Sequence, residues 1–213
     1  MRIVPIVEGH GEERAVPVLL RRWLRLRNFH RFFEVPDRAI NAKGSGNLKA
    51  RFEPGRHVGI EHYVGAALGN RPDAILVVID ADDECQRRIG GVGLGPELLA
   101  RAQTVAAPVP VAVVVANREY EAWFLASLQS IRTAGLLPRK NGRPNPRDPE
   151  TIRDAKGKTE ELMGRRYEET VHQLELTKGL SFAPGPRNRS RSLAKLVRDL
   201  ERLTQAARRR RVV

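Results

Sequence analysis

The sequence predicts an α/β fold in which helices flank a parallel central sheet, with a basic helical C-terminal appendage behind it. Three short runs rich in Val and Ile lack polar–apolar alternation, which is typical of strands buried on both faces. Segments with helical periodicity lie between these runs, and strands that alternate with helices form parallel sheets through right-handed crossovers. A chain of 213 residues is long enough for one such domain.

The three strongest strand predictions cover residues 2–7, 74–79 and 109–116, and the last of these reads VPVAVVVA. A weaker strand is predicted at 32–40. Pro36 interrupts that run, and because proline cannot donate to a sheet ladder, the run is expected near an edge of the sheet.

The clearest predicted helix covers residues 12–26, where Val16, Leu19, Leu20 and Trp23 fall on one stripe. Pro17 is tolerable only near the first turn of this helix, because proline lacks the backbone N–H. Further helices are predicted at 57–68, 98–103 and 119–129. Together with the strands they give the alternating order of a doubly wound sheet.

The character of the chain changes after residue 136. Residues 138–150 are rich in Pro, Gly and Asn and predict an exposed loop, followed by helices at 159–176 and 192–207. Residues 1–213 are therefore interpreted as a single domain, with an α/β core at about 1–130 and a basic helical appendage at about 131–213.

The positive charge is concentrated in the second part of the chain. The formal net charge is +13, and residues 131–213 hold 21 Lys and Arg against 10 Asp and Glu. Such an excess attracts polyanions through counterion release, so nucleic acid, either DNA or RNA, is the predicted partner. The alternative is a solubilising surface with a frayed tail at Arg208–Arg211.

Several classes of protein are not expected. No run approaches the roughly 18 apolar residues that a membrane span needs, and Glu8 comes too early for a signal peptide. Cys85 is a lone cysteine, which excludes an internal disulfide and a cysteine-rich zinc site. We therefore expect a cytoplasmic protein without a membrane partner.

Acidic side chains follow two of the predicted strands. Glu8 comes directly after the first strand, and Asp80 and Asp82 follow the strand at 74–79. Because ligands gather beyond the carboxyl ends of parallel strands, these carboxylates could share a cleft and hold Mg²⁺ or Mn²⁺. Each could also be an ordinary cap or a favourable charge at a helix N-terminus.

The stretches VEGHGEE and IDADDE resemble the Toprim family, shared by topoisomerases, primases and the nucleases of the overcoming-lysogenisation-defect (OLD) class. The resemblance covers most of the chain and is weakest beyond Leu180. A third stretch, NREYEAWF at 117–124, is similar to a signature of uncharacterised bacterial Toprim-like proteins. The resemblance implies that Glu8, Asp80 and Asp82 bind the metal, with Glu12, one helical turn beyond Glu8, as a further ligand.

The nuclease branch of that family also places a Glu after the next strand and a Lys further downstream. Glu121 or Glu119 fits the first role, and Lys156 or Lys158 the second; Glu121 and Lys156 are the residues we assign as catalytic. The implied activity is metal-assisted phosphodiester cleavage by a DNA or RNA endonuclease, with anti-phage defence as the implied role. A partner ATPase or a homo-oligomer is also implied.

Two other functions remain open at this point. One is a non-catalytic protein that keeps the fold and binds nucleic acid or a partner. The other is strand passage or primer synthesis, for which the expected tyrosine-bearing and helicase-like domains are missing from the sequence.

A glycine-rich basic segment, KGSGNLK at 43–49, could cradle phosphate, although it does not match the P-loop pattern. It is either a loop that faces the substrate or a plain connector.

Overall fold

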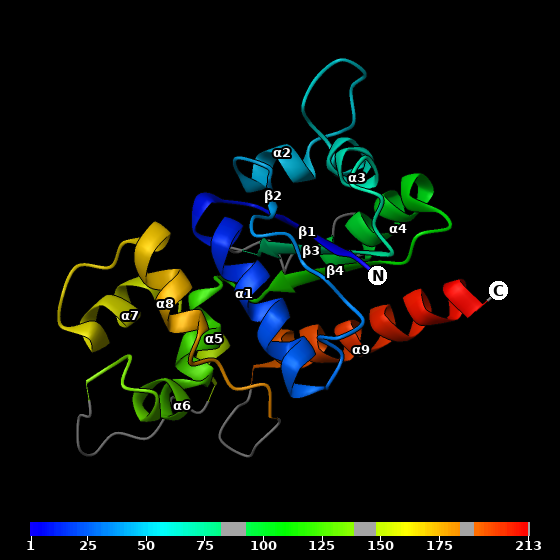
Figure 1. The fold of residues 1–213 in the computed structure, drawn as a ribbon. Coiled ribbons are helices and arrows are strands. Elements are labelled where there is room, and N and C mark those ends of the chain that lie inside the picture. The colour runs from blue at the N-terminus through cyan, green and yellow to red at the C-terminus, as the bar shows by residue number, and fades with distance from the viewer. Residues whose placement is uncertain (82–92, 139–147, 184–189, 213) are drawn as a thin grey trace.

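The computed structural model describes residues 1–81, 93–138, 148–183 and 190–212. Within them, four parallel strands form one sheet in the order β2-β1-β3-β4 (Figure 1). The strands are β1 Ile3–Val7, β2 Ile40–Asn41, β3 Ala74–Asp80 and β4 Val111–Ala116. The predicted α/β class with a parallel sheet flanked by helices is therefore confirmed.

The weak strand predicted at 32–40 is almost absent. Only its last residue, Ile40, belongs to β2, which pairs with β1 through Ile6–Ile40 and Val7–Asn41. A single bridge joins Glu34 to Arg2. This segment contains Pro36, and β2 lies at the edge of the sheet, where such an interruption is tolerated.

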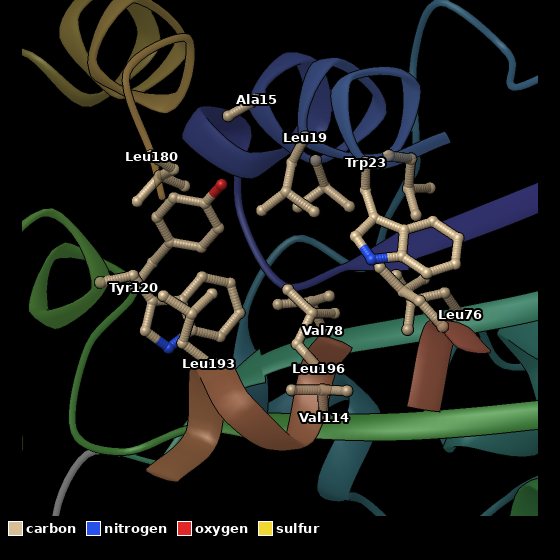
Figure 2. Close-up of a cluster of buried hydrophobic side chains, with 14 of the residues drawn as sticks. Ala15, Leu19, Trp23, Leu76, Val78, Val114, Tyr120, Leu180, Leu193 and Leu196 are labelled. Atoms are coloured by element: carbon tan, nitrogen blue, oxygen red, sulfur yellow. The ribbon is translucent and has the colours of Figure 1, made fainter. Parts of the chain in front are cut away.

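Helices cover both faces of the sheet, as its apolar strands require. On one face, alternate strand residues such as Leu76, Val78 and Val114 pack with α1 His10–Leu26 and α9 Arg191–Val212 (Figure 2). On the other face, the residues between them, such as Val77 and Val113, pack with α2 Ser45–Lys49, α3 Ile60–Leu68 and α4 Leu94–Ala106.

Helix α1 begins at His10, earlier than predicted, so Pro17 lies inside it. The missing N–H of Pro17 leaves the carbonyl of Glu13 without its usual partner within the helix. That carbonyl accepts a hydrogen bond of 2.8 Å from the backbone N–H of Ala39 instead. The proline thus joins α1 to the segment that leads into β2.

The chain after β4 forms shorter elements than the sequence predicts. The helix expected at 119–129 is two helices, and the one expected at 159–176 ends early because Gly164 adopts a left-handed conformation with φ 67°. The observed elements are α5 Glu121–Ala126, α6 Leu128–Thr133, the 3-10 turn η2 Pro149–Thr151, α7 Ala155–Met163, the π-helical turn η3 Glu169–Gln173 and α8 Leu174–Thr177.

Helix α9, in the basic part of the chain, packs on the sheet. Its apolar residues Leu193, Leu196, Leu200 and Leu203 are buried in the same cluster as α1, β3 and β4. At its far end, Arg211 Nε contacts Asp73 Oδ1 at 3.1 Å, close to the start of β3. The apolar residues of α9 thus contribute to the same core as the strands, although the helix is rich in basic residues. No helix in the described residues has the length and apolar character to cross a membrane.

Candidate active site at the carboxyl edge of the sheet

Two carboxylates lie on neighbouring strands at the carboxyl edge of the sheet. Glu8 directly follows β1, and Asp80 is the last residue of β3. Val7 is paired with Val78, so the two strands end side by side. The Glu8 Oε2 atom accepts a hydrogen bond of 3.0 Å from the backbone N–H of Asp80. This contact joins residues 72 positions apart and fixes the Glu8 side chain across the end of β3.

Two carboxylates with partly exposed surfaces supply the hard oxygen ligands that Mg²⁺ prefers, so Glu8 and Asp80 fit such an ion. Asp82, the third predicted ligand, lies outside the described residues. Within the described ranges, no three His, Cys, Asp or Glu side chains gather into a ready metal site. A complete ligand set would therefore need Asp82, water or substrate oxygens.

Glu12, the further predicted ligand, is buried with 9% of its surface exposed. Its Oε1 atom accepts a hydrogen bond of 2.8 Å from Gln173 Nε2 of η3. Glycines make room for this arrangement, since a Cβ on Gly11 would lie 2.1 Å from Gln173 Oε1 and one on Gly9 3.0 Å from Glu12 Oε2. The side chain of Glu12 is thus held between the Glu8 turn and η3.

The glycine-rich segment at 43–49 lies beside Glu8. The backbone N–H of Gly44 donates to the carbonyl of Glu8 at 2.8 Å, and Gly44 has a φ of 123° that favours glycine. Asn41 Nδ2 contacts Glu13 Oε2 at 3.2 Å and exposed His10 Nδ1 at 3.1 Å. The hydrogen bond from Asn41 lowers the pKa of Glu13. The segment at 43–49 therefore borders the candidate site.

Glu121, predicted to be catalytic, is buried in α5 with 1% of its surface exposed. Tyr167 donates its hydroxyl to Glu121 Oε1 at 2.8 Å. Burial raises the pKa of Glu121 to about 7, since that single side-chain donor compensates only part of the lost hydration. The structure therefore keeps this carboxyl away from solvent.

Lys156, the predicted cation, is half exposed on α7. Its Nζ forms an ion pair with Glu169, and its backbone N–H donates to Glu119 Oε2 at 2.8 Å. Burial opposes its charge, but the hydrogen bond to Glu169 and the nearby Glu121 outweigh that effect and raise the pKa of Lys156. Burial also raises the pKa of Glu119. Lys156, Glu169 and Glu119 thus form a charged group separate from Glu8 and Asp80.

The family of the chain follows from a match over most of its length. The model of the family described as Domain of unknown function (DUF4276) matches residues 7–201. The chain belongs to this family. The matched region of this family member includes both candidate carboxylates and reaches into α9.

The chain is also similar to a solved structure, the C-terminal region of the Burkholderia pseudomallei OLD protein. The TM-score is 0.48 at 16% sequence identity, and the match covers 97% of this chain and 98% of that chain. No curated protein matches the chain.

Sequence reasoning missed two residues that shape this part of the chain: Tyr167 and Gln173. Each meets its partner across a long stretch of chain, and Gln173 lies 161 residues from Glu12. A long-range hydrogen bond leaves no periodicity or spacing in the sequence, so no local signal could have identified them.

Proposed function

We propose that the chain is a metal-dependent phosphodiesterase of the Toprim type, acting as a DNA or RNA endonuclease. The observation that supports this most is the 3.0 Å hydrogen bond from the Asp80 N–H to Glu8 Oε2. It holds the Glu8 carboxylate at the end of β3, beside Asp80, where ligands collect in open parallel sheets. The excess of basic residues after position 130 supports a polyanionic substrate.

Glu8 and Asp80 would hold Mg²⁺ or Mn²⁺, with Asp82 contributing as the sequence suggests and Glu12 nearby. A cation bound there supplies charge to polarise the scissile phosphate and lowers the pKa of an attacking water. The chain itself contributes orientation: the Asp80 N–H fixes Glu8, and Gln173 fixes Glu12.

The two remaining predicted residues have more constrained roles. Lys156 would offset charge on the phosphate, and it would have to exchange its partner Glu169 for the substrate to do so. The resemblance assigns Glu121 to catalysis, and its burial supports a positioning role through Tyr167 rather than contact with the substrate.

A second candidate is a protein that binds nucleic acid or a partner without cleaving it. The observation in its favour is that Glu8 and Glu12 already accept hydrogen bonds, and that no three potential ligands gather among the described residues.

The test is incubation of purified protein with plasmid, single-stranded DNA and RNA in Mg²⁺, Mn²⁺ or chelator. Glu8→Gln keeps an oxygen for the Asp80 N–H while removing the charge, so it should abolish metal-dependent cleavage without lowering the melting temperature. Asp80→Ala should also abolish cleavage. Calorimetric titration with Mn²⁺ should show weaker binding to both variants.

Asp37→Ala is the matched control, since its carboxylate is 99% exposed and pairs with Arg21 away from this edge. It should cleave and bind metal as the wild type does. Binding of labelled nucleic acid without cleavage under any of these conditions would favour the second candidate. Full cleavage by Glu8→Gln would rule out the proposed site.

A further inference from the structure

At the carboxyl edge of the sheet, the described residues include one charged side chain close to the end of each strand, in a symmetrical order. Following the strand order β2-β1-β3-β4, the residues at or just beyond the strand ends are Lys43, Glu8, Asp80 and Arg118. Each cation comes two residues after the last residue of its strand. The two carboxylates therefore lie in the middle, with one basic residue on each outer strand.

Both basic residues have an unusual backbone. Lys43 has a φ of 58° and Arg118 a φ of 66°, the left-handed region that long side chains seldom occupy. Such conformations persist only where the surrounding structure holds them, and they concentrate at functional sites.

The turn that contains Lys43 is held from several sides. Its backbone N–H donates to Asn41 Oδ1 at 2.7 Å, and Asn47 Nδ2 donates to the carbonyl of Ala42 at 2.8 Å. The next residue, Gly44, donates to the carbonyl of Glu8. The Lys43 side chain is exposed, and among the described residues it makes no ion pair.

The turn that contains Arg118 is anchored on both sides. The preceding Asn117 donates through Nδ2 to Glu150 Oε2 at 3.3 Å. The following Glu119 accepts the backbone N–H of Lys156 at 2.8 Å. The Lys43 turn is thus tied to Glu8, and the Arg118 turn to η2 and α7.

We propose that Lys43 and Arg118 bind the two phosphates on either side of the phosphate that is cut, an inference that rests on the proposed function. Neighbouring strands are separated by about 4.8 Å, so the two outer strands are about 14 Å apart. Each cation therefore lies nearer to a phosphate over its own strand end than to one over the central carboxylates. A strand laid across the edge would place one phosphate at the central carboxylates and the next ones at the cations.

This arrangement assigns different tasks to the two kinds of charge. Cations that bind backbone phosphates fix the register and orientation of a strand without reading its bases. The substrate class would be an extended phosphodiester strand with a phosphate on each side of the cleavage point. A dinucleotide with one phosphate would lack both outer contacts.

The test compares Lys43→Gln, Arg118→Gln and the double variant with the wild type. Binding of a fluorescein-labelled single-stranded oligonucleotide is followed by fluorescence anisotropy across a salt series, with chelator present to prevent cleavage. The logarithm of the association constant falls linearly with the logarithm of the salt concentration. Each single variant should make this slope shallower by roughly 0.7, and the double variant by roughly 1.4. The two effects should add because the sites are well separated.

Arg71→Gln is the matched control. Like Lys43, Arg71 is exposed, and its φ is 50°, but it precedes β3 and so lies at the amino-terminal edge of the sheet. It should leave the slope unchanged. Arg118→Lys retains a positive charge and should keep the wild-type slope. Lys43→Gly, which relaxes the backbone, replaces Lys43→Gln if thermal unfolding shows that the latter is not folded.

Unchanged slopes in Lys43→Gln and Arg118→Gln would overturn the proposal, as would a reduction in only one of them. If the wild type cleaves nucleic acid while the slopes stay unchanged, the phosphodiesterase stands and the outer contacts fall. If the slopes drop as expected but no cleavage occurs with any metal, the outer contacts stand and the phosphodiesterase falls.

Discussion

Glu121 and Glu150 are both buried carboxylates near the end of β4, but their surroundings differ sharply. Glu121 is 1% exposed and Glu150 is 5% exposed. Glu121 receives one side-chain hydrogen bond, from Tyr167, and burial raises its pKa to about 7. Burial also acts on Glu150, but the hydrogen bonds from Ser192 and Ser190 outweigh it and lower the pKa of Glu150.

The number of donors explains this contrast. Glu150 Oε1 accepts bonds from the hydroxyls of Ser190 and Ser192, at 2.7 and 2.6 Å, and from the Ser192 N–H at 2.8 Å. Its Oε2 accepts from Asn117 Nδ2. Donors of this kind replace the lost hydration of a carboxylate. Glu150 therefore joins η2, the start of α9 and the end of β4, whereas Glu121 retains a large part of its desolvation penalty.

The largest expected effect is the loss of Glu150. Glu150→Ala removes the acceptor that Ser190, Ser192 and Asn117 share. Because their donors would be left without a partner, the fold should be destabilised by about 3 kcal/mol or more. Urea unfolding at pH 7 measures this change. Glu53→Ala, an exposed control, should stay within about 0.5 kcal/mol of the wild type.

At acidic pH, the difference in free energy of unfolding between Glu150→Ala and the wild type should become smaller. Because the folded pKa of Glu150 is lowered, its ionised form stabilises the fold above the ordinary value of 4.5, and that contribution is lost as the pH falls through the folded pKa. If Glu150→Ala lowers the free energy of unfolding by the same amount at pH 7 and at strongly acidic pH, the ionised carboxylate of Glu150 does not stabilise the fold as proposed.

Glu121 should behave in the opposite way. Its folded pKa of about 7 lies above the ordinary value of 4.5, so the fold binds a proton that the unfolded chain has released, and stability falls as the pH rises through this range. Glu121→Gln keeps an acceptor for Tyr167 and removes this penalty. It should stabilise the protein by about 2–3 kcal/mol at pH 8 and have little effect near pH 4.

Denaturant unfolding of Glu121→Gln and the wild type at both pH values provides the measurement. A variant that is no more stable than the wild type at pH 8 would show that Glu121 is better compensated than its contacts indicate.

The smallest expected effect comes from the side-chain donor to Glu121. Tyr167→Phe removes that hydroxyl and should cost about 1 kcal/mol, with a larger loss at pH 8 than at pH 5 because a hydrogen bond to an ionised carboxylate is stronger. Tyr63→Phe is the matched control, since its hydroxyl donates to the carbonyls of Ala42 and His57. Its loss, measured by urea unfolding, should not depend on pH over this range.

Much of the fold could be predicted because continuous runs of Val and Ile indicate buried strands. The run predicted at 2–7 is observed as Ile3–Val7, and that at 74–79 as Ala74–Asp80. The early end of α7 was not predicted, because the sequence alone does not show that Gly164 adopts a left-handed conformation. For the candidate site, the meeting of Glu8 and Asp80 follows from the carboxyl ends of parallel strands.

The sequence by itself determined the α/β class, the strand ends that carry Glu8 and Asp80, and the basic character of residues 131–213. These properties depend on local composition and periodicity. Only the tertiary structure decided that α9 packs on the sheet, that Lys156 pairs with Glu169, and that Glu121 and Glu150 differ. The environment of a buried charge depends on donors far along the chain, such as Tyr167, which lies 46 residues beyond Glu121. Folding brings those donors together, and their number then determines the pKa.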